Sequence, residues 1–127
     1  MFLRFVTLGK DSDSKHKQGL ITYAYDLRDE GEFDRYELET VNRIIDWFKE
    51  HVKIPSILKR DDSNRCISWF KSEAEEPINY MWELYYLFQA KGIAVEILKE
   101  EKIGEIKYED EWQVVAQPLR HNRKIKS

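Results

Sequence analysis

DRYELETVNRIIDWFKEHVKIP, residues 34–55, is the segment with the clearest local signal for the fold. Asp34 is followed three residues later by Glu37, which is the spacing of a capping box, and Phe33 is placed to contact Leu38 as a hydrophobic staple. Apolar residues then recur at helical spacing on one face, namely Leu38, Val41, Ile45, Phe48 and Val52. Since Pro55 cannot continue a helix, we predict an amphipathic helix that begins at Asp34 and ends before Pro55.

The segments on the N-terminal side predict a strand and a second helix. Residues 2–8 are rich in β-forming side chains, which indicates a strand followed by a polar loop. Residues 19–30 repeat apolar side chains at helical spacing, and Gly31 stands where a helix C-cap glycine belongs because glycine adopts a left-handed conformation at little cost. The two helices are separated by about three residues, so we predict a helical hairpin.

The C-terminal half predicts a strand, a helix and a closing hairpin. Residues 66–70 are typical of a short interior strand, and the helix around Pro77 carries apolar side chains on more than one stripe before Gly92 ends it. Residues 93–97 alternate, and after a turn at 101–104 residues 106–117 alternate again with one apolar and one polar face. We interpret the last two segments as the two strands of an antiparallel hairpin.

Together these elements predict an α+β fold with the order β-α-α-β-α-β-β. We expect a mostly antiparallel sheet of about four strands, with the helices packed largely on one face. Residues 1–119 should form a single domain, because 127 residues lie in the usual size range for one core. Residues 120–127 are expected to be a mobile basic tail.

Charge is distributed unevenly along the chain. Four of the 21 Lys and Arg residues lie in residues 120–127, which leaves 17 basic against 24 acidic side chains, a formal charge of −7, in residues 1–119. This balance argues against nucleic-acid binding by the body, because such binding depends on clustered Lys and Arg. Contact through the basic tail is left as a weaker possibility.

Cellular location is inferred from what the chain lacks. The apolar stretches are far shorter than the roughly 20 residues that a membrane span needs, and the N-terminus has no secretory signal pattern. Cys66 is the one cysteine, so it forms no internal disulfide and is typical of a small core residue. We therefore predict a cytoplasmic protein without membrane association.

Motifs for metals, cofactors and nucleophilic catalysis are missing. The three histidines, His16, His51 and His121, have no metal-ligand spacing, and the calcium-like start at Asp11 lacks the later ligands. No dinucleotide fingerprint and no nucleophile-elbow glycines occur. We therefore predict no metal, no cofactor and no catalytic residue.

Four residues are candidates for an interaction surface. Trp69 and Phe70 are consecutive in a strand and must face opposite sides of the sheet, so one layer of helices cannot cover both rings. Glu109 and Glu111 would lie about 7 Å apart on one strand face, either as paired carboxylates or as part of a solvated charged face. The uncovered ring suggests a homodimer or a partner protein on the sheet side.

Four further residues are candidates for a polar pocket or a buried pair. Asp110 is the one charge among the apolar positions of residues 106–116, so either a bulge turns it outward or donors meet it inside. We favour Arg4 as its partner, acting as a structural lock rather than as the floor of a pocket. Lys71 and Tyr108 are the other strand residues that could contribute.

These observations predict a non-enzymatic protein-binding module, such as an adaptor, an inhibitor or an immunity-type antagonist, that uses an acidic surface with exposed aromatics. The alternative is a small enzyme or ligand-binding domain with a pocket near Arg4, Lys71, Tyr108 and Asp110. A third possibility is nucleic-acid contact through the tail.

Overall fold

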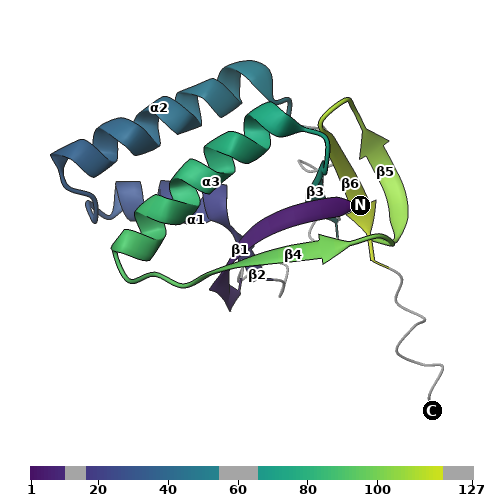
Figure 1. Ribbon diagram of the computed structural model, residues 1–127, viewed down its shortest axis with the longest axis horizontal. Helices are drawn as coiled ribbons and strands as arrows, with labels where there is room; N and C mark the ends of the chain where they lie inside the picture. Colours follow the sequence, from purple (N-terminus) through teal and green to yellow (C-terminus); the bar gives the residue numbers. More distant parts are fainter. Residues whose placement is uncertain (11–16, 55–65, 119–127) are drawn as a thin grey trace, which may run out of the picture.

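The computed structural model describes residues 1–10, 17–54 and 66–118, and this part of the chain contains three helices and six strands (Figure 1). In chain order the elements are β1 (Phe2–Lys10), β2 (Lys17–Gly19), α1 (Leu20–Asp29), α2 (Arg35–His51), β3 (Ile67–Lys71), α3 (Glu75–Ala90), β4 (Val95–Glu100), β5 (Glu105–Glu109) and β6 (Gln113–Gln117). The α+β class is confirmed. The sheet exceeds the expected four strands because β2 pairs with β1 and because residues 106–117 form two strands instead of one.

The helical hairpin is confirmed, and its second helix begins as predicted. The Asp34 carboxylate accepts a hydrogen bond from the Glu37 backbone N–H at 2.9 Å, and the Glu37 carboxylate accepts one from the Asp34 N–H at 2.9 Å. Gly31, with φ of 73°, lies between α1 and α2 in the conformation that favours glycine. All three helices lie on the same side of the sheet (Figure 1).

The sheet is antiparallel throughout, with β1 near its middle. Residues Phe2–Thr7 pair with Glu100–Val95 of β4 along one edge of β1. The other edge is shared, because Phe2 and Leu3 pair with β3 whereas Val6 pairs with β2. Beyond β3 follow β6 and then β5, so that β4 and β5 form the two long outer edges, and the three-residue β2 pairs only with β1 among the described strands.

The predicted C-terminal hairpin was wrong in its pairing. Strand β4 pairs with β1, and the true hairpin consists of β5 and β6, joined by a turn at residues 110–112. The expected separation into one apolar and one polar face also fails, because Gln113–Ala116 are all buried whereas Ile106 is 48% exposed. Strand β6 is interior to the sheet and has apolar neighbours on both sides, which alternation in sequence cannot show.

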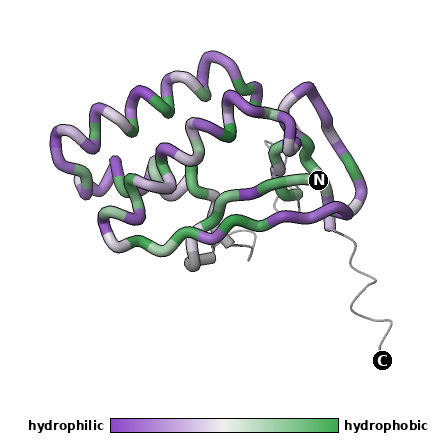
Figure 2. The backbone as a smooth tube through the Cα atoms, in the orientation of Figure 1, coloured by the Kyte–Doolittle hydropathy of each residue, from purple (hydrophilic) through white to green (hydrophobic). Residues whose placement is uncertain are grey.

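Apolar side chains form one cluster on each face of the sheet. The larger cluster joins the three helices to Phe5, with Phe70 packed against it. The smaller one contains Trp69, Ile103, Val114 and Ala116, with Phe2, Ile67 and Leu98 beside it. Hydrophobic residues accordingly dominate β1 and the first half of β4, whereas β5 is mainly hydrophilic (Figure 2).

Candidate functional site

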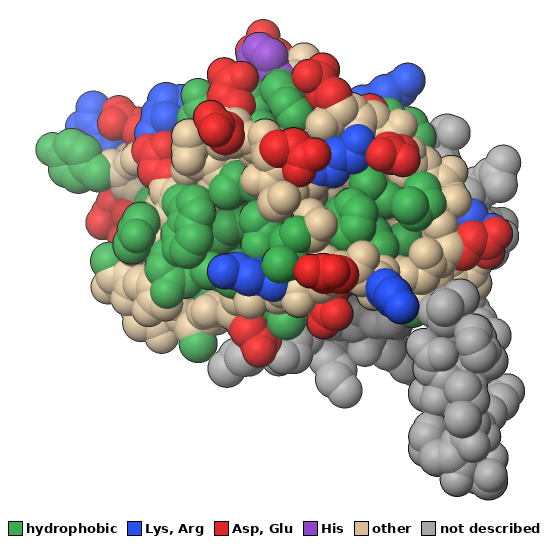
Figure 3. Space-filling model, turned by 45° about the vertical axis from the view of Figure 1, so that its right-hand side comes forward, with side chains coloured by type: hydrophobic (Ala, Val, Ile, Leu, Met, Phe, Trp, Pro, Cys, Tyr) green, Lys and Arg blue, Asp and Glu red, His purple; other side chains and the backbone are tan. Residues whose placement is uncertain are grey.

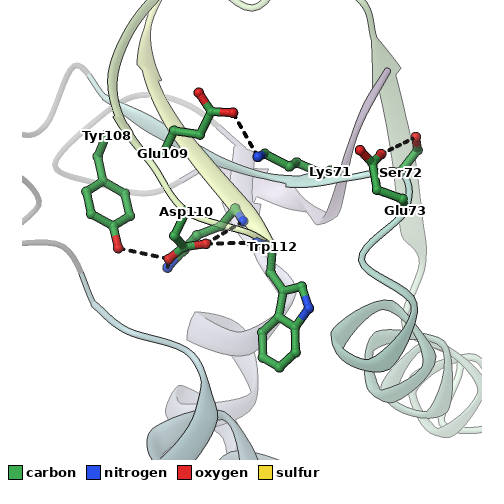
Figure 4. Close-up of polar contacts among 8 residues, drawn as sticks. Lys71, Ser72, Glu73, Tyr108, Glu109, Asp110 and Trp112 are labelled. Atoms are coloured by element: carbon green, nitrogen blue, oxygen red, sulfur yellow. Dashed lines mark hydrogen bonds and ion pairs between the residues drawn. The ribbon is translucent and has the colours of Figure 1, made fainter.

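The turn between β5 and β6 is organised around the carboxylate of Asp110 (Figure 4). One carboxylate oxygen accepts hydrogen bonds from the backbone N–H groups of Trp112 and Gln113, both at 2.9 Å. The other accepts from the Tyr108 hydroxyl at 2.8 Å and from the Gln113 amide at 3.2 Å. Four donors from one short segment therefore hold this side chain in place, and its oxygens are used in closing the turn.

Lys71 at the end of β3 joins this turn to the neighbouring strand. Its ammonium group lies 2.7 Å from the Glu109 carboxylate, and its backbone N–H donates to the Trp112 carbonyl at 2.8 Å. The Gln113 amide also donates to the Lys53 carbonyl, just after α2. The turn is thus tied to β3 and to the segment that follows α2.

The hydrogen bonds of this cluster shift the pKa values of Asp110 and Tyr108 in opposite directions. Partial burial of Asp110 raises its pKa, but the hydrogen bonds from Gln113, Trp112 and Tyr108 outweigh this effect and hold the pKa below its ordinary value. The hydrogen bond to Asp110 raises the pKa of Tyr108. Asp110 is therefore ionised and Tyr108 protonated near neutral pH, the states in which the hydroxyl donates to the carboxylate. We call this group of hydrogen bonds the turn lock.

An aromatic stack lies beside the turn, and sequence reasoning missed it. Trp47 of α2 stacks on Trp112 with ring centroids 5.6 Å apart, and it contacts Tyr80 of α3 at 4.6 Å and His51 at 4.7 Å. In the sequence, Trp47 and Trp112 each lie beside other apolar residues in a periodic segment, which is typical of core tryptophans. Because Trp47 and Trp112 are brought together by the tertiary fold alone, no local spacing in the sequence signals the contact.

The four interaction candidates do not form one surface. Trp69 is only 7% exposed and belongs to the smaller cluster, and its indole N–H has no acceptor within the described segments. Phe70 faces the helices, with its ring 6.2 Å from that of Phe48. Glu111 is exposed in the turn, whereas Glu109 is paired with Lys71. The two rings do face opposite sides, as predicted, but the chain itself covers Trp69.

Among the pocket candidates, Lys71, Tyr108 and Asp110 come together but Arg4 is elsewhere. Arg4 lies in the middle of β1, opposite Leu98 of β4. The prediction that Arg4 pairs with Asp110 was therefore wrong, because the donors to the Asp110 carboxylate are Tyr108, Trp112 and Gln113. The Asp110 carboxylate still has a structural role, but the element that it holds is the β5–β6 turn. Asp110 faces its own backbone because it lies in a turn and not, as expected, within a strand.

The connection between α1 and α2 is the most acidic part of the described chain, and we call residues 26–39 the acidic end. Its exposed acids are Asp26, Asp29, Glu30, Glu32, Asp34 and Glu39, and Arg35 is its one exposed base. The Lys91 ammonium group, directly after α3, lies 3.0 Å from the carboxylate of the half-buried Glu37. Tyr36 is 79% exposed, the largest exposed fraction among the exposed large apolar side chains. The acidic end lies at the opposite end of the helical layer from the β5–β6 hairpin (Figure 1).

Within the described segments, no group of three or more His, Cys, Asp or Glu side chains is arranged to hold a metal ion. None of the helices in these segments has the length and apolar character to cross a bilayer.

Comparison of the chain with protein-family models, curated proteins and solved structures gave no match. Function is therefore inferred from the residues of this chain alone.

Proposed function

We propose that the protein is a non-enzymatic, cytoplasmic protein-binding module that attaches to a basic partner protein through its acidic end. An adaptor, an inhibitor or an immunity-type antagonist would use such a surface. The observation that carries the proposal is the grouping of six exposed acids around one exposed base, with the exposed ring of Tyr36 among them. The single Cys66 supports a reducing compartment.

The chemistry of the acidic end suits protein recognition. Clustered carboxylates raise the local concentration of a cationic partner and speed its association, and an exposed tyrosine supplies apolar area together with a hydroxyl group. The body has a formal charge of −7, so the whole molecule contributes to the same field. Lys and Arg side chains of the partner would pair with the carboxylates while Tyr36 packs on its surface.

The β5–β6 turn supports the non-enzymatic part of the proposal. The carboxylate of Asp110 is occupied by four local donors, and Lys71 is paired with Glu109. These side chains are engaged in holding strands together, so they are poorly placed to bind or turn over a substrate. This argument favours the binding module over the small enzyme.

The test compares capture of cellular proteins by two charge-reversed variants of the full chain. One variant carries Asp29→Lys, Glu30→Lys and Glu32→Lys in the acidic end. The matched control carries Asp46→Lys, Glu50→Lys and Glu111→Lys, three exposed acids toward the other end of the molecule. Both variants undergo the same change of net charge, so a difference between them reports the position of the acids and not their number.

We expect the wild type and the control to retain the same basic protein and the acidic-end variant to lose it. The purified partner should then bind at least tenfold more weakly to the acidic-end variant in a direct titration, and binding should weaken as salt rises because the charges are exposed. Equal retention by the two variants, or no basic partner at low salt, would show that the acidic end is not a binding surface.

A further inference from the structure

The two outer edges of the sheet differ in how they are protected. Strand β5 has a register irregularity between Ile106 and Tyr108, and its charged side chains are engaged in ion pairs, Lys107 with Glu105 at 3.3 Å and Glu109 with Lys71. Bulges and charges of this kind are the usual means by which proteins prevent an edge from pairing with another chain. The β5 edge is therefore closed to strand addition.

The β4 edge lacks the register irregularity of β5, although three of its six residues are charged. Its six residues pair with β1 in unbroken register, and none of the other described strands pairs with its outer side. Three of its six residues, Val95, Ile97 and Leu98, are apolar and half-buried, and they lie within its first four positions. A regular edge without a bulge, with apolar side chains at three of its first four positions, is a template for an additional strand.

An aromatic surface on α3 accompanies this edge. Trp82 contacts Tyr85 and Tyr86 with ring centroids 5.0 and 6.0 Å apart, and Tyr86 is 66% exposed. Trp82 also contacts Phe5 of β1 at 5.4 Å, and α3 packs on β4, so the helix lies over the β4–β1 pair. Hydrophobic side chains gather on this face of the molecule with charged residues around them (Figure 3).

We propose that a second copy of this chain covers the edge, by antiparallel pairing of the two β4 strands about a two-fold axis at Ile97. In such a pair one residue must oppose its own counterpart at the axis. With Ile97 at the axis, Val95 opposes Lys99 of the second copy and Glu96 opposes its Leu98. With the axis at Leu98, Glu96 would lie opposite Glu100 of the second copy, and with the axis at Glu96, the two Glu96 side chains would lie opposite one another. Both arrangements place like charges together, which is destabilising.

The charges on β4 favour a second copy over a basic peptide. Glu96, Lys99 and Glu100 alternate in sign along the strand, so the edge has no uniform negative field that would select a cationic segment. The antiparallel arrangement also separates the acidic ends. Lys91, four residues before β4, pairs with Glu37 of the acidic end, so the acidic end lies near the start of β4. The two-fold axis places the start of each β4 strand beside the end of the other, so the two acidic ends lie apart.

The same axis brings the two α3 helices into contact. Neighbouring strands lie about 4.8 Å apart, so two helices that each lie over a β4–β1 pair would be about 10 Å from one another. This is the interaxial distance of packed helices, roughly 8–10 Å. The exposed ring of Tyr86 and its neighbours would then be buried between the helices, so one interface accounts for both the open edge and the aromatic surface.

The experiment is sedimentation velocity on the full chain across the micromolar range, with two tyrosine variants. Tyr86→Lys places a charge in the proposed interface, and Tyr36→Lys is the matched control, an exposed tyrosine on α2 at the acidic end. We expect the wild type and Tyr36→Lys to dimerise alike and the dimer dissociation constant of Tyr86→Lys to rise at least tenfold. Circular dichroism of both variants checks that they are folded.

Cross-linking tests the register independently. In a Cys66→Ala background, Ile97→Cys should form a disulfide-linked dimer under mild oxidation because the two cysteines would oppose one another at the axis, whereas Lys99→Cys should not. A chain that stays monomeric at the highest concentration, a dimer that Tyr86→Lys does not weaken, or equal cross-linking at 97 and 99 would each overturn the proposal.

Discussion

Asp110 is met by several donors, as the sequence allowed, but they come from its own turn and not from Arg4. Its carboxylate is satisfied by hydrogen bonds from within its own turn, so the cost of burying a charge that was expected in a strand does not arise. We expect Asp110→Asn to lower the free energy of unfolding by about 1 kcal/mol, because the group is partly exposed and solvent screens its interactions. Urea denaturation of the wild type and the variant measures the difference.

The effect of Asp110→Asn should depend on pH in a defined direction. The pKa of Asp110 lies below its ordinary value of 3.8, so the folded state binds its proton less readily than the unfolded state does. The stabilisation is therefore complete above that ordinary value and is lost as the pH falls through the lowered value. Equal stability of the two proteins at neutral pH would contradict the turn lock, and Glu111→Gln, next to Asp110 and exposed, serves as the control.

Gly104 is a second residue whose identity the structure requires. Its φ is 109°, and a Cβ added there would overlap the backbone carbonyl of Gln117 and lie 2.8 Å from the Cα of Pro118. Gly92 also has a positive φ, 81°, but a Cβ there would meet nothing within 4 Å. We expect Gly92→Ala to cost about 1–2 kcal/mol from backbone strain alone, and Gly104→Ala to cost about 2 kcal/mol more from the overlap. Thermal or urea denaturation of both variants would measure this gap, and equal losses would contradict it.

At the scale of elements, the capping box of α2 makes a direct prediction. Asp34→Ala removes the oxygen that accepts from the Glu37 N–H, which should destabilise the protein by about 1 kcal/mol. Glu39→Ala, an exposed position in the second turn of α2, should leave stability nearly unchanged. Urea denaturation of the two variants decides the matter, since a similar result for both would mean that the cap contributes nothing.

The sequence predicted helices better than strand partners, for a physical reason. The signals for α2 lie within four residues of one another, because capping and helical periodicity are local. The pairing of β4 with β1 joins residues 88 to 98 positions apart and leaves no local trace. The sequence also did not show that residues 106–117 form two strands. Apolar and polar residues still alternate on both sides of the turn that Asp110 closes, so the segment resembles one strand.

At the scale of the whole molecule, the sheet with apolar clusters on both faces accounts for the error about Trp69. The sequence showed correctly that Trp69 and Phe70 face opposite sides, and it showed that helices would cover one of them. It could not show that Ile103, from the segment between β4 and β5, joins Trp69 in a second cluster. Trp69 therefore needs no partner to cover it, and the surface that we propose a second copy covers is the open edge of β4. The acidic end had a signal in the sequence, since seven acids lie within residues 26–39, but the exposure of Tyr36 required the fold.

The distribution of charge also predicts how the whole molecule responds to nucleic acid. The body has a formal charge of −7, and four cations lie in residues 120–127, so only the tail is suited to phosphate. Each neutralised phosphate contributes about −0.9 to the slope of log affinity against log salt for duplex DNA, so four cations allow a slope no steeper than about −3.6. A chain that ends at Leu119 should show no binding in fluorescence anisotropy at moderate salt, and the full chain should bind weakly with this shallow slope. A steeper slope, or tight binding by the shortened chain, would mean that Lys and Arg side chains of the body form a phosphate-binding face, and the acidic end would then have to lie away from that face.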